Sequence, residues 1–326
     1  DGYFTDFISN GVSTELCFVA FCAFTLIIIF AGVQNGIERV SKIMMPILIV
    51  LSVIIAVYSV TRPGALAGVK YFLVPNVKNF SWMTVVSAMG QMFYSLSIAM
   101  GILITFGSYM KKDTAIEDST RNVEIFDTGI AIMAGLMIIP AVFAFSGGDP
   151  DTLQAGPSLM FITIPKVFQN MGFGTVIGIV FFLLVLFAAV TSSIALTESA
   201  VSTFEDELGW GRKKATVLVG VIMLALGSLS SLGYGPLAGI KIIGMQFLDL
   251  FDFLTNSVMM PIAALITSLL VSRVVGIDKI EDEIIHGESA FRRKKVFVVM
   301  IKYLCPVFAI IILLSSVANA LGWIKM

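Results

Sequence analysis

One strongly apolar stretch, residues 90–110, has small and hydroxylated residues at its centre rather than the large aliphatic residues that surround them. These residues fall at every second position: Ser95, Ser97, Ala99 and Gly101. The spacing spreads them around a helix, so it favours an unwound segment over a packing stripe. The alternative is a helix face of small residues on which a neighbouring membrane helix packs closely.

A helix that opens inside a bilayer leaves N–H groups free on one side of the gap and C=O groups free on the other. Because every such group needs a partner in lipid, a break persists only beside protein or a polar cavity. The free N–H groups attract an anionic group and the free C=O groups attract a cation. Tyr94 supplies a flat, amphipathic side chain beside the gap. We therefore interpret residues 84–110 as a broken helix that carries the substrate and ion site of a secondary transporter.

A second group of oxygen donors lies in the segment FAAVTSSIALTES. Ala188, Thr191 and Ser192 are spaced i, i+3 and i+4, so they share one helix face. Such hydroxyls often only bond the carbonyl one turn back. Facing a helix break, however, they would offer neutral oxygen ligands, which suit a hard cation such as Na⁺.

Several carboxylates lie near the ends of the apolar segments. If its helix begins where the hydropathy rises, Asp127 belongs to the first helical turn. The helix dipole stabilises an acidic side chain at that position. If the helix begins near Thr114, Asp127 is an intramembrane carboxylate that requires a cation or a partner. Asp249 and Asp252 are spaced i, i+3 and either face an external vestibule or cap a helix. Asp206 is most simply a solvated charge in a loop.

The composition indicates a polytopic membrane protein. The 326 residues are 57% hydrophobic and only 13% charged, whereas soluble domains carry about 25% charged residues. The net charge of −1 shows no excess of Lys and Arg of the kind that indicates nucleic-acid binding. The three cysteines are isolated and the single histidine lies in a charged loop, so neither a metal site nor a disulfide framework is indicated. No HExxH motif or paired-carboxylate dyad supports a membrane-embedded hydrolase, and we expect no enzyme.

Eight segments are long and apolar enough to cross a bilayer, for which about 20 residues are needed. They are residues 13–33, 41–61, 84–110, 122–146, 174–204, 213–233, 247–272 and 297–322. Lys and Arg concentrate in the loops after the first, third, fifth and seventh segments, which predicts that these loops are cytoplasmic. The external loop 147–172 is too apolar to be free. It is either a plug of short helices in a vestibule or an interfacial helix lying on the lipid.

Five sequence motifs, in order along the chain, resemble the neurotransmitter:sodium symporter family, specifically its bacterial, leucine transporter-like amino-acid transporters. They are QNGIERVSKIMMP, GQMFYSLSIAMGILITFGSY, MFITIP, FAAVTSSIALTE and FEDEL. The resemblance implies an all-α inverted-repeat fold in which five helices are related to the next five by a pseudo-two-fold axis. It also implies that this chain holds family helices four to eleven and lacks helices one to three, so we expect a piece of a longer protein. Residues 1–83 would then end the first repeat, residues 84–272 form the second, and residues 273–326 hold the final helix.

The resemblance also implies roles for individual residues. The substrate-binding positions would be Phe93, Tyr94, Ser95, Ser97, Met100, Ser192 and Leu196. Ser95 and Asp127 would belong to the first sodium site, and Ala188, Thr191 and Ser192 to the second. Tyr94 would close over the substrate, while Asp252 and Asp206 would be the acidic halves of the external and internal gates.

One departure from the family pattern concerns chloride. Asp127 falls where relatives often carry Asn, and Ala131 falls one turn on, where chloride-dependent members carry Ser. The resemblance therefore predicts that Asp127 supplies the fixed negative charge and that chloride is not required.

We expect sodium-coupled symport of a neutral, hydrophobic or aromatic amino acid by alternating access, in a multi-pass protein of the cell membrane, the inner membrane of a bacterium. Its partners would be the amino acid, sodium ions, the lipid bilayer and the absent N-terminal helices. Two alternatives stay open. A proton-coupled permease of the same fold would carry an ionisable residue in place of the Thr191–Ser192 pair, and a non-transporting membrane scaffold would show no uptake.

Overall fold

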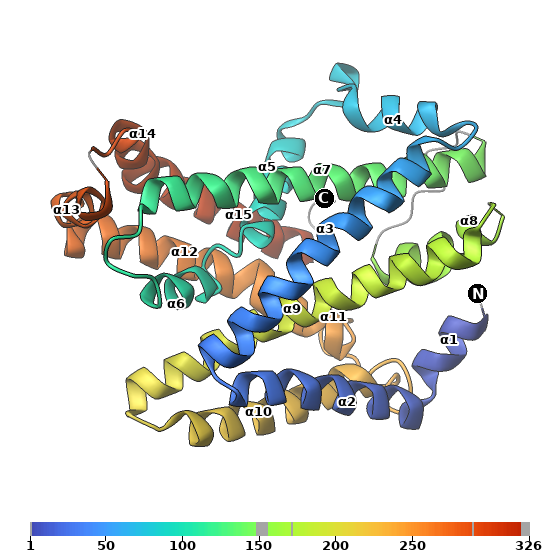
Figure 1. The fold of residues 1–326 in the computed structure, drawn as a ribbon, viewed down its shortest axis with the longest axis horizontal. Coiled ribbons are helices and arrows are strands. Elements are labelled where there is room, and N and C mark those ends of the chain that lie inside the picture. Colours follow the sequence, from blue (N-terminus) through green and yellow to red (C-terminus); the bar gives the residue numbers. More distant parts are fainter. Residues whose placement is uncertain (1, 148–155, 171, 289, 321–326) are drawn as a thin grey trace. The chain divides into compact units, whose positions relative to one another are not determined.

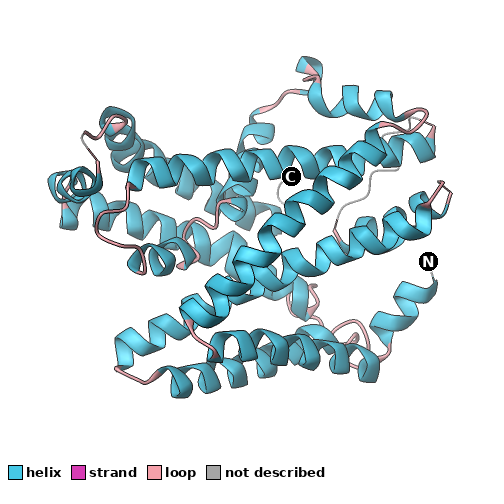
Figure 2. Cartoon of the chain, viewed as in Figure 1, coloured by secondary structure: helices cyan, strands magenta, loops and turns pink. Residues whose placement is uncertain are grey.

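The computed structural model describes residues 2–147, 156–170, 172–288 and 290–320, and these are helices joined by loops (Figures 1 and 2). Among these residues there is no strand, only one isolated antiparallel bridge between Ile242 and Met245. Seven helical segments of the described residues are long and apolar enough to cross a membrane. They comprise Gly11–Phe30, Val33–Val60, Ile116–Ser146, Gly174–Leu208, Arg212–Leu232, Phe247–Val275 and Lys294–Ala320. They correspond to seven of the eight predicted spans, and the remaining one, 84–110, is the predicted broken helix.

The chain forms two compact units, and each unit gathers segments that are distant in the sequence. The first unit consists of Asp1–Asn79, Thr128–Thr197 and Trp210–Leu237. The second consists of Phe80–Asp127, Glu198–Gly209 and Ala238–Met326. Helices α7 (Ile116–Ser146) and α9 (Gly174–Leu208) contribute one part to each unit.

The first unit contains the remaining helices of the N-terminal half together with α10. Its elements are α1 (Gly2–Ser9), α2 (Gly11–Phe30), the π-helical turn η1 (Val33–Glu38), α3 (Arg39–Val60), α4 (Ala65–Leu73), the 3-10 turn η2 (Val77–Asn79), the π-helical turn η4 (Leu159–Thr163), α8 (Ile164–Gln169) and α10 (Arg212–Leu232). Helix α4 lies between two of the predicted spans, 41–61 and 84–110.

Helices α2 and α10 pack closely because glycines face large side chains across their interface. A Cβ at Gly227 would lie 2.1 Å from the Phe18 ring, and one at Gly220 would lie 3.0 Å from Leu26. Since Phe18 precedes Leu26 while Gly227 follows Gly220, the two helices are antiparallel. Membrane helices use small residues in this way, because lipid is as apolar as leucine and association depends on close van der Waals contact.

The core of the first unit includes the short helix α8. Ile164, Val167 and Phe168 are buried there among residues of α3, α7 and α9, including Ile55 and Phe181. The apolar segment therefore packs inside the protein, as the plug prediction requires. Phe161 is the exception, because it is 41% exposed and stacks on Phe4 and Phe182. Residues 148–155 of the predicted plug lie outside the described residues.

The second unit holds the broken helix and the C-terminal helices. Its further elements are α5 (Trp82–Ser95), α6 (Ile102–Ser108), α11 (Phe247–Asp252), the π-helical turn η5 (Phe253–Met259), α12 (Met260–Leu269), the π-helical turn η6 (Leu270–Val275), α13 (Ile277–Gly287), α14 (Lys294–Val299), the π-helical turn η7 (Met300–Leu304) and α15 (Cys305–Ala320). Helix α12 packs along α15. A buried cluster joins these two helices to α5: Phe93, Met260, Ala264, Ala309 and Ile312.

The start of α7 is fixed by the segment that follows α13. The Glu288 carboxylate accepts hydrogen bonds from the backbone N–H groups of Glu117 at 2.6 Å and Asp118 at 3.3 Å. An acceptor and a negative charge at this end satisfy N–H groups that have no partner within the helix. The Glu117 carboxylate in turn accepts from the Arg292 N–H at 2.9 Å. Helix α7 therefore begins at Ile116, six residues before the predicted start of the span.

Candidate functional site

The predicted break in residues 84–110 is present. Helix α5 ends at Ser95 and α6 begins at Ile102, with a non-helical segment between them (Figure 1). Ser97, Ala99 and Gly101 have left-handed φ values of 53°, 65° and 79°. Only glycine adopts this region freely, and other residues lose about 1–2 kcal/mol there. Such strain persists only where surrounding contacts hold the backbone, which is common at functional sites.

The last turn of α5 is closed by its own backbone, whereas the first turn of α6 is open. The N–H groups of Ser97 and Ile98 donate to the carbonyls of Tyr94 and Phe93, both at 3.0 Å. The leading N–H groups of α6 have no acceptor within the helix, as at any helix start. The break therefore presents backbone donors at the end where α6 begins.

The C-terminal part of α9 supports the break through Ser199. Its hydroxyl donates to the Met100 carbonyl at 3.4 Å and lies 3.5 Å from the Thr105 hydroxyl. A Cβ added at Gly101 would lie 2.6 Å from the Ser199 Oγ, so a side chain at that position would collide with this contact. A side chain at this position would therefore have to adopt a left-handed φ and displace the Ser199 hydroxyl.

Asp127 lies beside the break. The Ser95 hydroxyl donates to Asp127 Oδ1 at 2.7 Å, and both side chains are half-buried. Asp127 is eleven residues beyond the first residue of α7, about 17 Å along the helix at 1.5 Å per residue. The interpretation of Asp127 as a first-turn residue is therefore wrong, and the structure supports the alternative of an intramembrane carboxylate with a partner.

The second group of predicted oxygen donors lies on α9 in the first unit, whereas Ser95 and Asp127 belong to the second. The Thr191 hydroxyl donates to the carbonyls of Ala188 at 3.0 Å and Phe187 at 3.1 Å, so it bonds one turn back. A hydroxyl that donates in this way keeps its oxygen lone pairs available to a cation. Ser192 and Leu196 are exposed, the latter to 49%.

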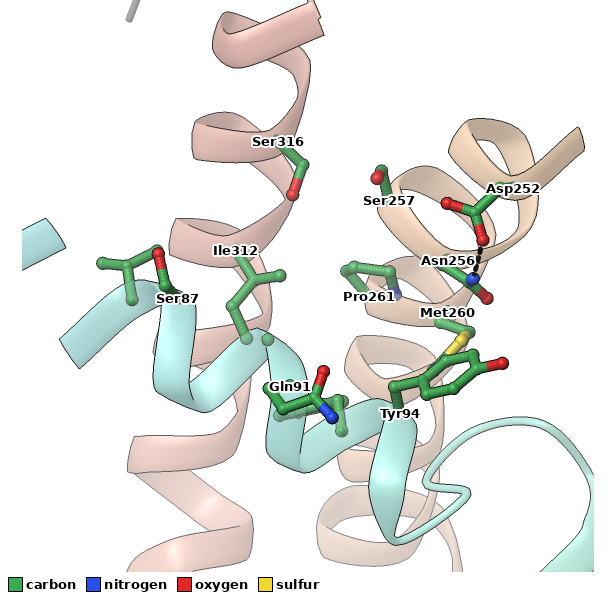
Figure 3. A pocket seen from close by; sticks show the side chains of 13 residues that line it. Ser87, Gln91, Tyr94, Asp252, Asn256, Ser257, Met260, Pro261, Ile312 and Ser316 are labelled. Carbon is green, nitrogen blue, oxygen red and sulfur yellow. Dashed lines mark hydrogen bonds between the residues drawn. The ribbon is translucent and has the colours of Figure 1, made fainter. Parts of the chain in front are cut away.

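A cavity of about 430 Å³ lies in the second unit among α5, the α11–α12 helix and α15 (Figure 3). Tyr94, 53% exposed, and Asp252 both line it. Asn256, one turn after Asp252, donates through Nδ2 to Asp252 Oδ1 at 2.5 Å and so orients the carboxylate (Figure 3). Tyr94, predicted to close over the substrate, and Asp252, predicted to act at the external gate, therefore line one cavity.

The other predicted site residues are dispersed. Phe93 is buried in the packing cluster with α12 and α15, and Met100 packs against that cluster. Ser97 is half-buried at the break. Asp206 is exposed but lies within α9, because the helix continues to Leu208. Its placement in a loop was wrong: the apolar pattern stops at residue 204, while the helix extends further.

One buried pair was not predicted. Glu198 is fully buried in α9, and its Oε1 accepts a hydrogen bond from the Tyr109 hydroxyl at 2.7 Å. The signal was present in the sequence, because Glu198 is a carboxylate within a predicted span, where ionisable residues are expensive and usually functional.

Residues 7–323 match the Sodium:neurotransmitter symporter family. The chain belongs to this family. Its members are transporters rather than enzymes. The seven apolar helices and the match identify a multi-pass protein of the cell membrane.

Three relatives illustrate the match. An uncharacterized sodium-dependent transporter, YhdH of Bacillus subtilis (strain 168), is 33% identical over 96% of this chain and 69% of its own length. Another, from Methanocaldococcus jannaschii, is 30% identical over 79% of this chain and 52% of its own length. The crystal structure of MhsT in complex with L-phenylalanine superposes with a TM-score of 0.84 at 34% identity, covering 97% of this chain and 70% of MhsT. The chain thus spans between about half and 70% of the length of these proteins.

Proposed function

We propose that the protein couples the uptake of a neutral amino acid with an apolar or aromatic side chain to the entry of Na⁺, by alternating access and without chloride. The observation that carries the proposal is the Ser95–Asp127 hydrogen bond at the break between α5 and α6. It places a carboxylate and a hydroxyl at the point where a membrane helix has lost its internal hydrogen bonds. Discontinuous helices provide substrate and ion sites in secondary transporters.

The available donors suit Na⁺ better than a transition metal. Among the described residues there is no group of three or more His, Cys, Asp or Glu side chains that could hold a metal ion. Ser95 and Asp127 instead offer a hydroxyl and one carboxylate, which together form a hard, oxygen-only first site. The Ala188 carbonyl with the Thr191 and Ser192 hydroxyls would form a second, uncharged site.

Coupling follows from the position of the first site. A cation held by Ser95 and Asp127 would stabilise the open backbone at the break, and that backbone would also hold the amino acid. Each ligand would then raise the affinity for the other by the same factor, as thermodynamic linkage requires. Asp127 supplies the permanent negative charge and Ala131 offers no chloride ligand, so the proposal includes independence from chloride.

The substrate class rests on the lining residues and on one relative. Ser192 and Leu196 are exposed on α9, and Tyr94 is exposed beside the break. Each of these residues is proposed to contact the substrate, and MhsT was crystallised with L-phenylalanine, whose side chain is aromatic. In this proposal Tyr94 and Asp252 act at the external gate and Asp206 at the internal one. The proposal also includes the division of the chain into repeats. The first repeat would end with residues 1–83, the second would comprise residues 84–272, and the final segment would be residues 273–326.

The proposal is tested by uptake of radiolabelled phenylalanine into vesicles that contain the complete protein, with a competition panel of the other amino acids. Replacing external Na⁺ by choline should abolish accumulation, and replacing chloride by gluconate should leave it unchanged. Equal uptake in Na⁺ and choline would refute sodium coupling and favour the proton-coupled alternative if a pH gradient then drives uptake. Absence of uptake under all conditions would favour the scaffold alternative.

A further inference from the structure

Two lysines on the last apolar segment, Lys294–Ala320, have no partner in the described part of the chain. Lys295 lies at the start of this segment and Lys302 lies within it, and both residues are exposed (α14 and α15 in Figure 1). The neighbouring Lys294 is different, because its ammonium group forms an ion pair with the Glu281 carboxylate. Among the described residues, no ion pair or hydrogen bond involves the ammonium group of Lys295 or Lys302.

The depth of Lys302 makes this lack of a partner informative. Lys302 is seven residues beyond Lys295, or about 10 Å along the helix. If the basic run at residues 292–295 marks the membrane surface, Lys302 begins inside the hydrocarbon layer, each half of which is about 15 Å thick. Ionisable residues at such depth nearly always face the protein interior or pair with one another. Lys302 does neither among the described residues, so we look for its partner outside this chain.

Helix geometry directs both ammonium groups towards the same membrane surface. Side chains of an α-helix tilt towards its N-terminus, and this segment begins after the basic loop that is predicted to be cytoplasmic. The flexible Lys302 side chain can therefore extend along the helix to the interfacial zone, as lysines in membrane helices do. Lys295, Val299 and Lys302 are spaced i, i+4 and i+7, which places them on one side of the helix. The two unpaired charges thus lie one above the other on an exposed face.

The surface around the two lysines is apolar. Val296, Val299 and Tyr303 are 63%, 50% and 65% exposed. In the most apolar part of this segment 11% of the residues are buried, against 22–33% in the other six apolar segments of the described chain. A face that combines exposed apolar side chains with unpaired cations at its cytoplasmic end fits an amphiphile with an anionic end.

We propose that the face formed by Lys295, Val296, Val299, Lys302 and Tyr303 binds a phospholipid whose headgroup is negatively charged, as in phosphatidylglycerol. The phosphodiester would accept hydrogen bonds from both ammonium groups and supply the counter-charge that the described chain does not. A zwitterionic headgroup would bring a cation of its own next to the two lysines, so it should bind less tightly. The acyl chains would lie against the apolar side chains, which is why the occupant is a lipid rather than a soluble phosphate.

The test compares two lipids that share their acyl chains and differ in headgroup charge. The complete protein, purified and delipidated in detergent, is titrated with dioleoyl phosphatidylglycerol or dioleoyl phosphatidylcholine, and bound lipid is counted by native mass spectrometry. Each lysine near an anionic headgroup should contribute about fivefold in affinity, so the wild type should prefer the glycerol lipid by about 25-fold. Lys295→Gln and Lys302→Gln should each lower this preference about fivefold, and the double variant should abolish it.

Three controls separate this face from general electrostatic attraction. Lys302→Arg keeps the charge and should retain the preference. Lys279→Gln removes an exposed lysine of α13, outside the apolar segment, and should also retain it. Glycerophosphoglycerol, the same headgroup without acyl chains, should not displace the bound lipid from the wild type, and displacement at equal concentration would show a soluble phosphate site instead.

Either of two results would overturn the proposal. The first is equal binding of the two lipids by the wild type, which is also expected if a helix outside residues 1–326 covers this face; this comparison requires no variant. The second is an unchanged preference in the Lys295→Gln/Lys302→Gln variant, which would place the anionic-lipid site elsewhere. The assay measures lipid binding alone, so its outcome is independent of sodium-coupled uptake.

Discussion

The hydrogen bond between Ser95 and Asp127 gives the sharpest test of the proposed sodium site. Its geometry, 2.7 Å from the Ser95 Oγ to Asp127 Oδ1 with both groups half-buried, is that of a charge-assisted hydrogen bond. Ser95→Ala removes the donor and one cation ligand but keeps the carboxylate. Asp127→Asn keeps a polar side chain of similar shape but removes the charge. The double variant removes both.

The expected magnitude follows from the contacts. A hydrogen bond to a charged group contributes about 1.5–3 kcal/mol, and every 1.4 kcal/mol changes an equilibrium constant about tenfold. Ser95→Ala should therefore raise the Na⁺ concentration for half-maximal uptake by about tenfold or more. Asp127→Asn should raise it at least as much, and added chloride should partly restore uptake in that variant. Because the two residues act together, the double variant should be less impaired than the sum of the single effects.

The assay is the Na⁺ dependence of phenylalanine uptake by each variant, at fixed chloride and again with gluconate. Ser108→Ala is a matched control, because the Ser108 hydroxyl donates at 2.7 Å to the Thr105 carbonyl within its own helix. Asp113→Asn, at an exposed loop position, controls for loss of a carboxylate. Fully additive single effects, or an unchanged Na⁺ curve in Asp127→Asn, would refute the reasoning.

Three further predictions concern α9, the cavity and the break. Replacing Thr191 and Ser192 by Ala should weaken the Na⁺ dependence of uptake before it alters substrate preference, and an unchanged Na⁺ titration would contradict a second sodium site. Tyr94→Ala should raise the KM for the amino acid about tenfold or more, since burying an aromatic side chain against a ligand contributes about 1.5–3 kcal/mol, whereas Tyr94→Phe should retain the wild-type KM. Gly101→Ala combines a left-handed φ of 79° with a Cβ 2.6 Å from the Ser199 Oγ, so it should lower both the unfolding temperature and uptake. The variant Gly101→Ala/Ser199→Ala should recover part of the loss, and identical losses in both variants would show that the Ser199 contact is unimportant.

Much of the fold could be predicted from the sequence because bilayer-spanning helices are specified locally. A run of about 20 apolar residues has few alternatives in lipid, where every backbone group must be bonded within the segment. For the same reason, small residues at every second position in the middle of a run predicted the break, and three of them, Ser97, Ala99 and Gly101, have a positive φ. The helix ends were less predictable. Helices α7 and α9 extend into polar sequence, where hydropathy no longer marks the boundary.

What the sequence could not decide is which side chains meet. The depth of Asp127 depends on the start of α7, and that start is set by Glu288, 171 residues away from Glu117 along the chain. The pairings of Ser95 with Asp127 and of Tyr109 with Glu198 likewise join segments that no local pattern connects. Local hydrophobicity determines where a chain crosses the membrane. Only the packing of helices against one another determines which polar groups share a buried space, because that depends on contacts between residues far apart in sequence.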